Sequence, residues 1–420
     1  MRRRIASLVP PSCTQEDRNI RLLYRITVAD GIWGGGTAAF LLVFLARMEA
    51  SSFLIGAVTA LPALLSVFLS LPASAYVERQ SNHVRATVRF SLLGYTCFAA
   101  LVFLPFLDAR YVPILVVILW GLQAIPMSIG SVAWMSVLGS VISSGRRAMV
   151  NGMRWAFSGI FTAIFVAIFG QILDAPAIPF PLNYQLVFLI SAAALYGGIW
   201  FVTRMEMPLD EVVPAPAGQP WHRMFADLLG PVVRNSTFMK YIGATFVLRL
   251  GIALPVALYS IYWVQNLQAS DSMIGLRTTA GQIALVAGYF LLGRVASRKG
   301  HRTILLGSAA ALALYPIATA LSPSAGWLVP AALLWGFATS GMNISFFEVL
   351  FETAPPQKRP SFVAVYVMSA NLANVVGPMI GALLMAQLGI HVAFMIAGGL
   401  HVAGAALCWG LGVGGKAEPA

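Results

Sequence analysis

The stretch "ASSFLIGAVT" at residues 50–59 returns 219 positions later as "ASDSMIGLRT" at residues 269–278. The same offset pairs "SAYVERQSNHVR" (74–85) with "GRVASRKGHRTI" (293–304), while a slightly shorter offset places "LWG" at both 119–121 and 334–336. Several short matches in one order indicate an internal duplication. The sequence therefore predicts two related halves with the same succession of elements.

The composition indicates that these halves lie in a membrane. Hydrophobic residues make up 59% of the 420 residues, charged residues only 10%, and the mean hydropathy is +0.80, whereas about a quarter of a soluble domain is charged. Stretches of about 20 apolar residues can each cross a bilayer as a helix. Twelve such stretches occur, at about 24–46, 53–76, 87–107, 112–138, 149–172, 184–203, 237–263, 273–296, 302–321, 328–351, 361–387 and 391–413.

A linker separates the sixth stretch from the seventh. Residues 206–220 are rich in proline and polar residues, a composition typical of a loop. The following "WHRMFADLLG" (221–230) has one apolar face, which favours a short helix on the membrane surface over an ordinary loop. We expect a tail (1–18), an N-terminal six-helix bundle (19–205), a linker (206–236), a C-terminal six-helix bundle (237–414) and a second tail (415–420).

The net charge of +12 follows from topology. With the N-terminus inside the cell, 23 of the 27 Lys and Arg residues fall in cytoplasmic segments, and Arg47, Arg110 and Arg277 fall outside. Cytoplasmic loops of membrane proteins carry such an excess of basic residues. We therefore expect a multi-pass plasma-membrane (inner-membrane) protein with both termini cytoplasmic, and no binding of nucleic acid.

Three motifs resemble those of the major facilitator superfamily. "GRVASRKGHR" (293–302) is similar to the family's loop after the second helix of a half, with Ser297 in place of the acid. "ETAPPQKRP" (352–360) is similar to the exit of its tenth helix, and "GPMIGA" (377–382) to its Gly-Pro-rich helix. The resemblance implies an all-α membrane fold of 12 transmembrane helices in two pseudo-symmetric bundles.

Departures from the family pattern weigh against a drug/proton antiport mechanism. The first-half loop is degraded, because Ser74 and Ser81 replace glycines. Antiporters of this type carry an Arg four residues before a Gly on helix 4, where Val117 precedes Gly121 here. Their Gly-Pro motif lies on helix 5, whereas the similar piece in this chain lies on helix 11.

Two charges are predicted to lie deep in the membrane. Asp30 stands in "ADGIWGGGTAAF" (29–40), and the 219 offset places it opposite Arg249. In the resembled fold, helices 1 and 7 face each other across the cavity, and charges inside a membrane normally mark a pathway. Asp30 and Arg249 are thus a candidate substrate, proton or gating pair, with a static ion pair as the alternative.

Asp30 also lies in a polar stripe at helical spacing, with Thr27, Gly34 and Thr37. We expect this stripe to face the cavity. The glycines around it favour close packing of helix 1 against a neighbour over a bending role.

Further pathway candidates come from helical spacing, although each is as consistent with an ordinary helix contact. They are polar or aromatic residues that suit an amphipathic solute with little charge. The set comprises Gln123, Trp134, Arg154, Trp155, Tyr259, Gln282, Tyr289, Thr339, Asn343 and Asn371, with Thr278 and Trp335 beside them. A second set, at the cytoplasmic helix ends, is expected to form a gate: Glu78, Arg79, Arg147, Arg298, Glu352 and Arg359.

Signatures of an enzyme are lacking, since the five histidines show no metal-ligand spacing. We expect no cofactor. The sequence favours a monomeric secondary transporter that moves a small amphipathic organic solute by alternating access, coupled to protons and with export favoured over import. A lipid flippase and a non-transporting sensor or assembly factor on the same fold remain as alternatives.

Overall fold

The structure is a computed structural model that describes residues 14–206, 229–355 and 359–414. In these ranges the chain is helical, and no strand occurs in them. Most of the predicted linker, including residues 221–228 of the expected surface helix, lies outside the described residues.

The N-terminal half contains six membrane-crossing segments, some of them built from more than one helix. They are α1 (Gln15–Trp33) with the π-helix η1 (Gly34–Ala38) and α2 (Ala39–Arg47); α3 (Ser52–Glu78); α4 (His83–Ala100) with η2 (Leu101–Phe106); α5 (Val112–Leu122) with α6 (Ala124–Val141); α7 (Ser144–Leu173); and α8 (Leu182–Val202).

The C-terminal half repeats this succession. Its segments are α10 (Ser236–Ala253) with α11 (Val256–Ile261) and the π-helix η3 (Tyr262–Asn266); α12 (Asp271–Lys299); α13 (His301–Ala320); α14 (Leu328–Thr353), preceded by η4 (Ala325–Trp327); α15 (Arg359–Leu388); and α16 (Ile390–Gly410).

Eleven of these segments are long and apolar enough to cross a membrane. The remaining one, α14, is 26 residues long and is less apolar because Thr339, Ser340 and Asn343 interrupt it. Twenty-six helical residues extend about 39 Å, which exceeds the hydrocarbon thickness of a bilayer. The predicted all-α membrane fold of twelve segments in two bundles is therefore confirmed.

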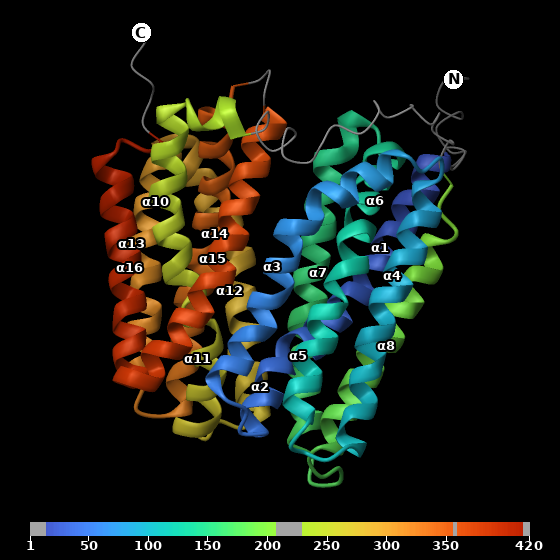
Figure 1. Cartoon of the computed structure of the whole chain (residues 1–420), viewed down its shortest axis with the longest axis vertical. Coiled ribbons are helices and arrows are strands. Elements are labelled where there is room, and N and C mark those ends of the chain that lie inside the picture. Colours follow the sequence, from blue (N-terminus) through green and yellow to red (C-terminus); the bar gives the residue numbers. More distant parts are fainter. Residues whose placement is uncertain (1–13, 207–228, 356–358, 415–420) are drawn as a thin grey trace, which may run out of the picture.

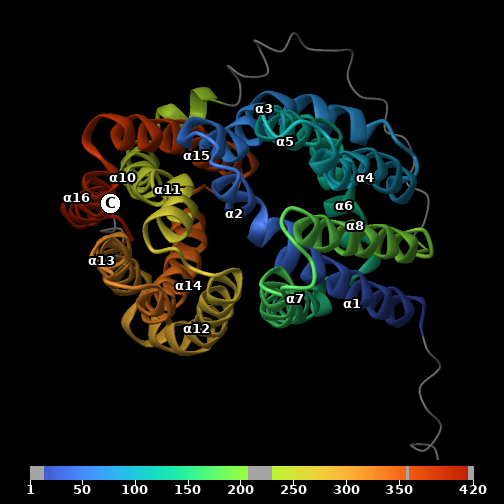
Figure 2. The ribbon, with the colours of Figure 1, turned by 90° about the horizontal axis from the view of Figure 1, so that it is seen from below.

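The two halves stand side by side, with the described chain beginning at Thr14 and ending at Gly414 near the same end of the bundles (Figure 1). We call this the Thr14 end and the opposite one the Arg47 end. The halves meet where α3 packs on α15 and where α7 packs on α12. Seen from the Arg47 end, α2 lies between the halves beside α11 (Figure 2).

Apolar packing differs between the two ends. At the Arg47 end one core joins both halves, since Phe44 and Tyr184 belong to the same buried cluster as Leu258 and Phe394. Towards the Thr14 end each half has its own core, one around Leu23 and Val202, the other around residues such as Phe238 and Phe362. Close packing of apolar side chains thus joins the halves at the Arg47 end.

Both halves interrupt their first segment at the same place. In the N-terminal half the interruption is the π-helix Gly34–Ala38. Adding 219 places these residues on 253–257, where α10 ends at Ala253 and α11 begins at Val256. Pro255 explains the second interruption, because proline has no backbone N–H and clashes with the preceding turn.

Candidate functional site

A cavity of about 320 Å³ lies where α2 faces the C-terminal half. One wall is apolar and comes from α2, and the other walls come from α10, α11, η3, α12, α13, α14 and α16. Its lining consists of Ala39, Leu42, Val43, Ile252, Val256, Tyr259, Ser260, Trp263, Arg277, Thr278, Leu312, Tyr315, Trp335 and His401.

Arg277 is the cation of this cavity. Its side chain is only 9% exposed, and its guanidinium lies 4.2 Å from the Trp263 ring centroid and 5.8 Å from that of Trp335. The guanidinium also donates a hydrogen bond to the Tyr315 hydroxyl. The sequence counts Arg277 among the charges of the outer side and does not reveal its burial: the residue lies two turns inside α12, held by aromatic rings.

Three buried nitrogens of the cavity lining have no hydrogen-bond partner: the donors Trp263 Nε1 and Arg277 Nε, and His401 Nε2. His401 Nδ1 lies 2.8 Å from the Ala397 carbonyl oxygen, so Nδ1 carries the proton and Nε2 of the neutral ring is an acceptor. Buried polar groups are nearly always hydrogen-bonded. The two unpartnered donors, Trp263 Nε1 and Arg277 Nε, make the cavity a candidate site for a hydrogen-bond acceptor.

The halves are joined by a polar cluster at the Arg47 end, which we call the Arg47 lock and which consists of Arg47, Asp174, Tyr184 and Asp271. Arg47 Nη2 lies 2.9 Å from Asp271 Oδ1 and also donates to the Ala269 carbonyl. The Tyr184 hydroxyl donates to the same carboxylate oxygen at 2.7 Å. Arg47 and Tyr184 thus bind an acid of the opposite half.

Asp174 completes the lock from the end of α7. Its two carboxylate oxygens accept the backbone N–H groups of Asp271 and Ser272, each at 2.9 Å. An anion at a helix N-terminus satisfies free N–H groups and meets the positive end of the helix dipole. Although burial acts to raise the pKa of Asp174, hydrogen bonds from Ser272 and Asp271 outweigh it and lower the pKa below its ordinary value.

Two glycines allow α7 and α12 to approach at this lock. A Cβ atom on Gly275 would lie 2.7 Å from the Val166 carbonyl oxygen, and one on Gly170 would lie 2.9 Å from that of Asp271. Any larger residue at either position would push the backbones apart. The close contact between the halves therefore depends on these two residues.

The structure does not pair Asp30 with Arg249. The charge that acts on Asp30 is Arg154 of α7, and the hydroxyl of Tyr95 on α4 also lies within its field. Arg249 instead donates to the Tyr366 hydroxyl and stacks on the rings of Phe346 and Tyr366. In this conformation the two charges belong to separate environments, one in each half.

The polar stripe of α1 contacts neighbouring helices. The Thr27 hydroxyl donates to the Leu23 carbonyl, and the backbone N–H of Thr37 donates to Ser191 Oγ on α8. A Cβ on Gly34 would lie 2.8 Å from Thr162 Oγ1 on α7. The glycines of this stretch allow close packing, while the π-helix in which Gly34 lies is a local irregularity common at functional sites.

Of the remaining pathway candidates, Tyr259, Thr278 and Trp335 line the cavity. Gln123 donates to the Trp120 carbonyl, and Trp134 lies over the Arg154 guanidinium, 5.5 Å away. Asn343 donates to the Tyr289 hydroxyl at 2.9 Å. Trp155 is exposed, whereas Gln282, Thr339 and Asn371 are half-buried.

The candidates for a cytoplasmic gate lie at the Thr14 end. Glu78, Arg79, Arg298 and Glu352 are all exposed, and no ion pair joins Arg298 to Glu352 in the described residues. Arg147 donates to the carbonyls of Gly139 and Ile142. The side chain of Arg359 lies outside the described ones.

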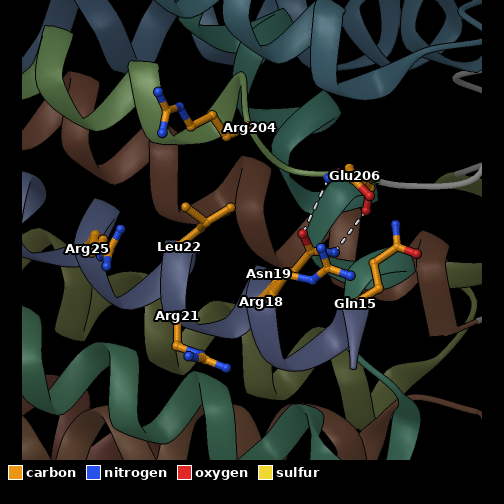
Figure 3. Close-up of a pocket in the computed structure, with 8 residues that line it drawn as sticks. All are labelled: Gln15, Arg18, Asn19, Arg21, Leu22, Arg25, Arg204 and Glu206. Carbon is orange, nitrogen blue, oxygen red and sulfur yellow. Dashed lines mark hydrogen bonds between the residues drawn. The ribbon is translucent and has the colours of Figure 1, made fainter. Parts of the chain in front are cut away.

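The Thr14 end also carries an arginine-lined pocket of about 290 Å³. Arg18, Arg21 and Arg25 of α1 and Arg204 after α8 line it, and Asn19 joins the two elements by hydrogen bonds to the Glu206 backbone (Figure 3). Its positive charge marks the Thr14 end as the basic face of the molecule.

Sequence reasoning missed Arg277, Trp263, Tyr315 and His401 in the cavity and all four residues of the Arg47 lock. A signal did exist in the duplication. The 219 offset places Asp271 opposite Ser52 and Arg277 opposite Val58. Each charge is therefore present in the second half and absent from the matching position of the first half. Charges that break an internal symmetry could have identified these two positions.

Comparison with known proteins agrees with this architecture. The sequence model of the Major Facilitator Superfamily matches residues 241–418. A solved structure of a POT family transporter in complex with a thioalcohol-conjugated peptide superposes with a TM-score of 0.74 over 94% of this chain and 96% of that one, at 11% identity. At such low identity the likeness shows the fold.

Two curated relatives match part of the sequence. The tetracenomycin C resistance and export protein of Streptomyces glaucescens is 28% identical over 43% of this chain and 30% of its own length. The 3-(3-hydroxy-phenyl)propionate transporter of Escherichia coli (strain K12) is 30% identical over 38% of each protein. The chain therefore matches less than half of the length of either relative.

Proposed function

We propose that this chain, which belongs to the major facilitator superfamily, is a secondary active transporter that moves a small amphipathic organic solute by alternating access. One observation carries the proposal: a cavity with apolar walls and unpartnered donors lies directly inside the Arg47 lock. Val43 of its lining is one helical turn from Arg47. A solute in the cavity would thus be shielded from the Arg47 end by a contact that can open.

The difference between the two ends supports alternation. The halves share one apolar core and the lock at the Arg47 end, while each has a separate core towards the Thr14 end. Rocking of the halves about the central site would break the lock and bring the Thr14 ends together. The structure then represents one of the two states.

We assign the Thr14 end to the cytoplasm and the chain to the plasma membrane. The arginine-lined pocket in Figure 3 lies at this end, and basic residues gather on the cytoplasmic side of membrane proteins. On this assignment the Arg47 lock is the outer gate and the structure is inward-facing.

Proton coupling is assigned to Asp30. The carboxylate lies near the middle of the first segment, in the field of Arg154 and next to the π-helix Gly34–Ala38. A membrane-buried acid whose distance from a cation changes between two states takes up and releases a proton. Outward movement of the solute is supported by the name of one relative, a resistance and export protein.

The test uses the purified chain in proteoliposomes that contain a pH-sensitive dye. With an imposed pH gradient, a panel of small amphipathic aromatic solutes is added and proton movement and solute counterflow are recorded. We expect at least one solute to drive proton movement in the unmodified protein but not in Asp30→Asn. Absence of both proton movement and counterflow for the whole panel would refute the proposal.

A further inference from the structure

We propose that the cavity binds an organic anion, with a carboxylate held by Arg277 and an apolar, aromatic body held by the surrounding walls. The inference rests on the proposed transport function, whose solute it places in a chemical class. It comes from the cavity lining, which has a positive charge without a matching negative charge and hydrogen-bond donors without acceptors.

The first part of the imbalance is charge. Arg277 is only 9% exposed. No Asp or Glu is among the described residues that line the cavity. The acid nearest in sequence, Asp271, is already bound to Arg47. A buried cation without an anion is costly, because the desolvation of its charge is not compensated. Cation–π contacts with Trp263, Tyr315 and Trp335 offset part of this cost.

The second part is hydrogen bonding. One terminal nitrogen of Arg277 donates to Tyr315, while the Nε–H has no partner. The rings and the Tyr315 hydroxyl hold the guanidinium in place, and its Nε–H remains without an acceptor. A guanidinium edge matches a carboxylate, which accepts two parallel hydrogen bonds.

The unpartnered N–H of Trp263 and ring nitrogen of His401 extend this polar side of the cavity. His401 packs closely on α10, since a Cβ on Gly251 would lie 2.7 Å from its Nδ1. The Trp263 N–H can donate to a second acceptor on the same molecule, such as a hydroxyl or carbonyl oxygen, and His401 Nε2 can accept from a hydroxyl. The lining thus supplies donors and a positive charge but no negative charge.

The remaining walls select an apolar body. Leu42 and Val43 of α2 face the C-terminal half, where Ile252, Val256 and Leu312 also contribute to the lining. A volume of about 320 Å³ lies at the lower end of the range for small-molecule sites. A small inorganic anion would leave these walls without contacts, so an aromatic or aliphatic acid fits the cavity better than phosphate or chloride.

The experiment measures binding to the purified full-length chain by calorimetry. The probes are 3-(3-hydroxyphenyl)propionate, its primary amide, the matching amine 3-(3-hydroxyphenyl)propylamine, and a series of phenylalkanoates of increasing chain length. We expect the acids to bind at least about tenfold more tightly than the amide, as a charge-assisted hydrogen bond predicts. The amine should bind most weakly, and acetate, which lacks the ring, should bind far more weakly than the aromatic acids.

Variants then locate the anion. Arg277→Gln should abolish the preference for acid over amide, and Arg277→Lys should retain part of it because the charge remains while the planar fork is lost. Trp263→Phe keeps the ring and removes the N–H, and should weaken acid binding by less than Arg277→Gln does. Arg110→Gln, a change at an exposed arginine outside the cavity, is the matched control and should change nothing.

The inference is overturned if no acid binds, if the amide or amine binds as tightly as the acids, or if folded Arg277→Gln keeps the preference. Should Arg277→Gln fail to fold, the probe series on the unmodified chain decides. If the cavity prefers a neutral or cationic probe and the protein still moves solute, the proposal of an anion site is refuted and the transport function is not. Selective acid binding without any transport would refute the transport function and leave the anion site standing.

Discussion

Arg47 at the end of α2 and Asp271 at the start of α12 form an ion pair of 2.9 Å between two halves of one duplicated chain. The Asp271 side chain is 5% exposed and the Arg47 side chain 26% exposed, so the acid is the partner that cannot reach water. Tyr184 and the backbone N–H groups bound by Asp174 complete the contact. Interaction energy is therefore concentrated at one end of the molecule.

Asp271→Asn is expected to open the Arg47 end. The change removes the buried charge that Arg47 binds, and breaking a buried pair costs about 3–5 kcal/mol; the partly exposed Arg47 can recover some of this from water. The measure is labelling of Ser260→Cys, a buried residue of the cavity lining, by an impermeant thiol reagent applied from outside. An unchanged labelling rate would show that the pair does not hold the end closed.

Asp174→Asn should open the same end to a smaller extent, because an amide accepts the α12 N–H groups without a charge. The pKa of Asp174 is lowered in the closed state, from an ordinary value of 3.8. Its contribution is therefore complete above that value and is lost as the pH falls through the lowered one. Any rise in Ser260→Cys labelling that comes from Asp174 should thus appear only below the ordinary value, and it should be absent from Asp174→Asn. An equal response to pH in both proteins would assign it to another group.

Gly275→Val should also favour the open Arg47 end. A Cβ at this position would lie 2.7 Å from the Val166 carbonyl oxygen, so α7 and α12 could not keep their present distance. Gly293→Val on the same helix is the control, because no atom lies within 4 Å of its added Cβ. The two variants should differ by at least about tenfold in Ser260→Cys labelling, the effect of about 1.4 kcal/mol. Equal labelling would mean that the close approach is not required for closure.

Asp30→Asn is expected to fold and insert, because an amide costs less to bury than a carboxylate. Solute movement driven by a pH gradient should be lost, while exchange of solute without a gradient should persist. If Asp30 only balances the charge of Arg154, Asp30→Asn will instead destabilise the protein, and the double variant with Arg154→Gln will restore both stability and gradient-driven transport. That restoration would remove Asp30 from the proton pathway.

The fold could be predicted from sequence because the duplication and the apolar stretches are properties of the chain itself. The site was harder to predict. Asp30 and Arg249 occupy matching positions in the two copies, but pseudo-symmetry relates environments and does not bring two side chains together. The cavity around Arg277 is assembled from segments that meet only in the folded molecule, with Trp263, Tyr315 and His401 far apart along the chain. The sequence pattern counted Arg277 only as a charge of the outer side, since hydropathy could not register the aromatic rings that bury it.

Alternating access is tested most directly by measuring both ends at once with spin labels. One label pair spans the halves at the Arg47 end (Tyr111→Cys with Leu321→Cys) and the other at the Thr14 end (Arg79→Cys with Lys299→Cys), in a chain whose native cysteines are replaced. We predict that Asp271→Asn lengthens the distance at the Arg47 end and shortens the distance at the Thr14 end. If the first distance grows while the second stays unchanged, or if neither changes, the halves do not alternate about the cavity and the account fails.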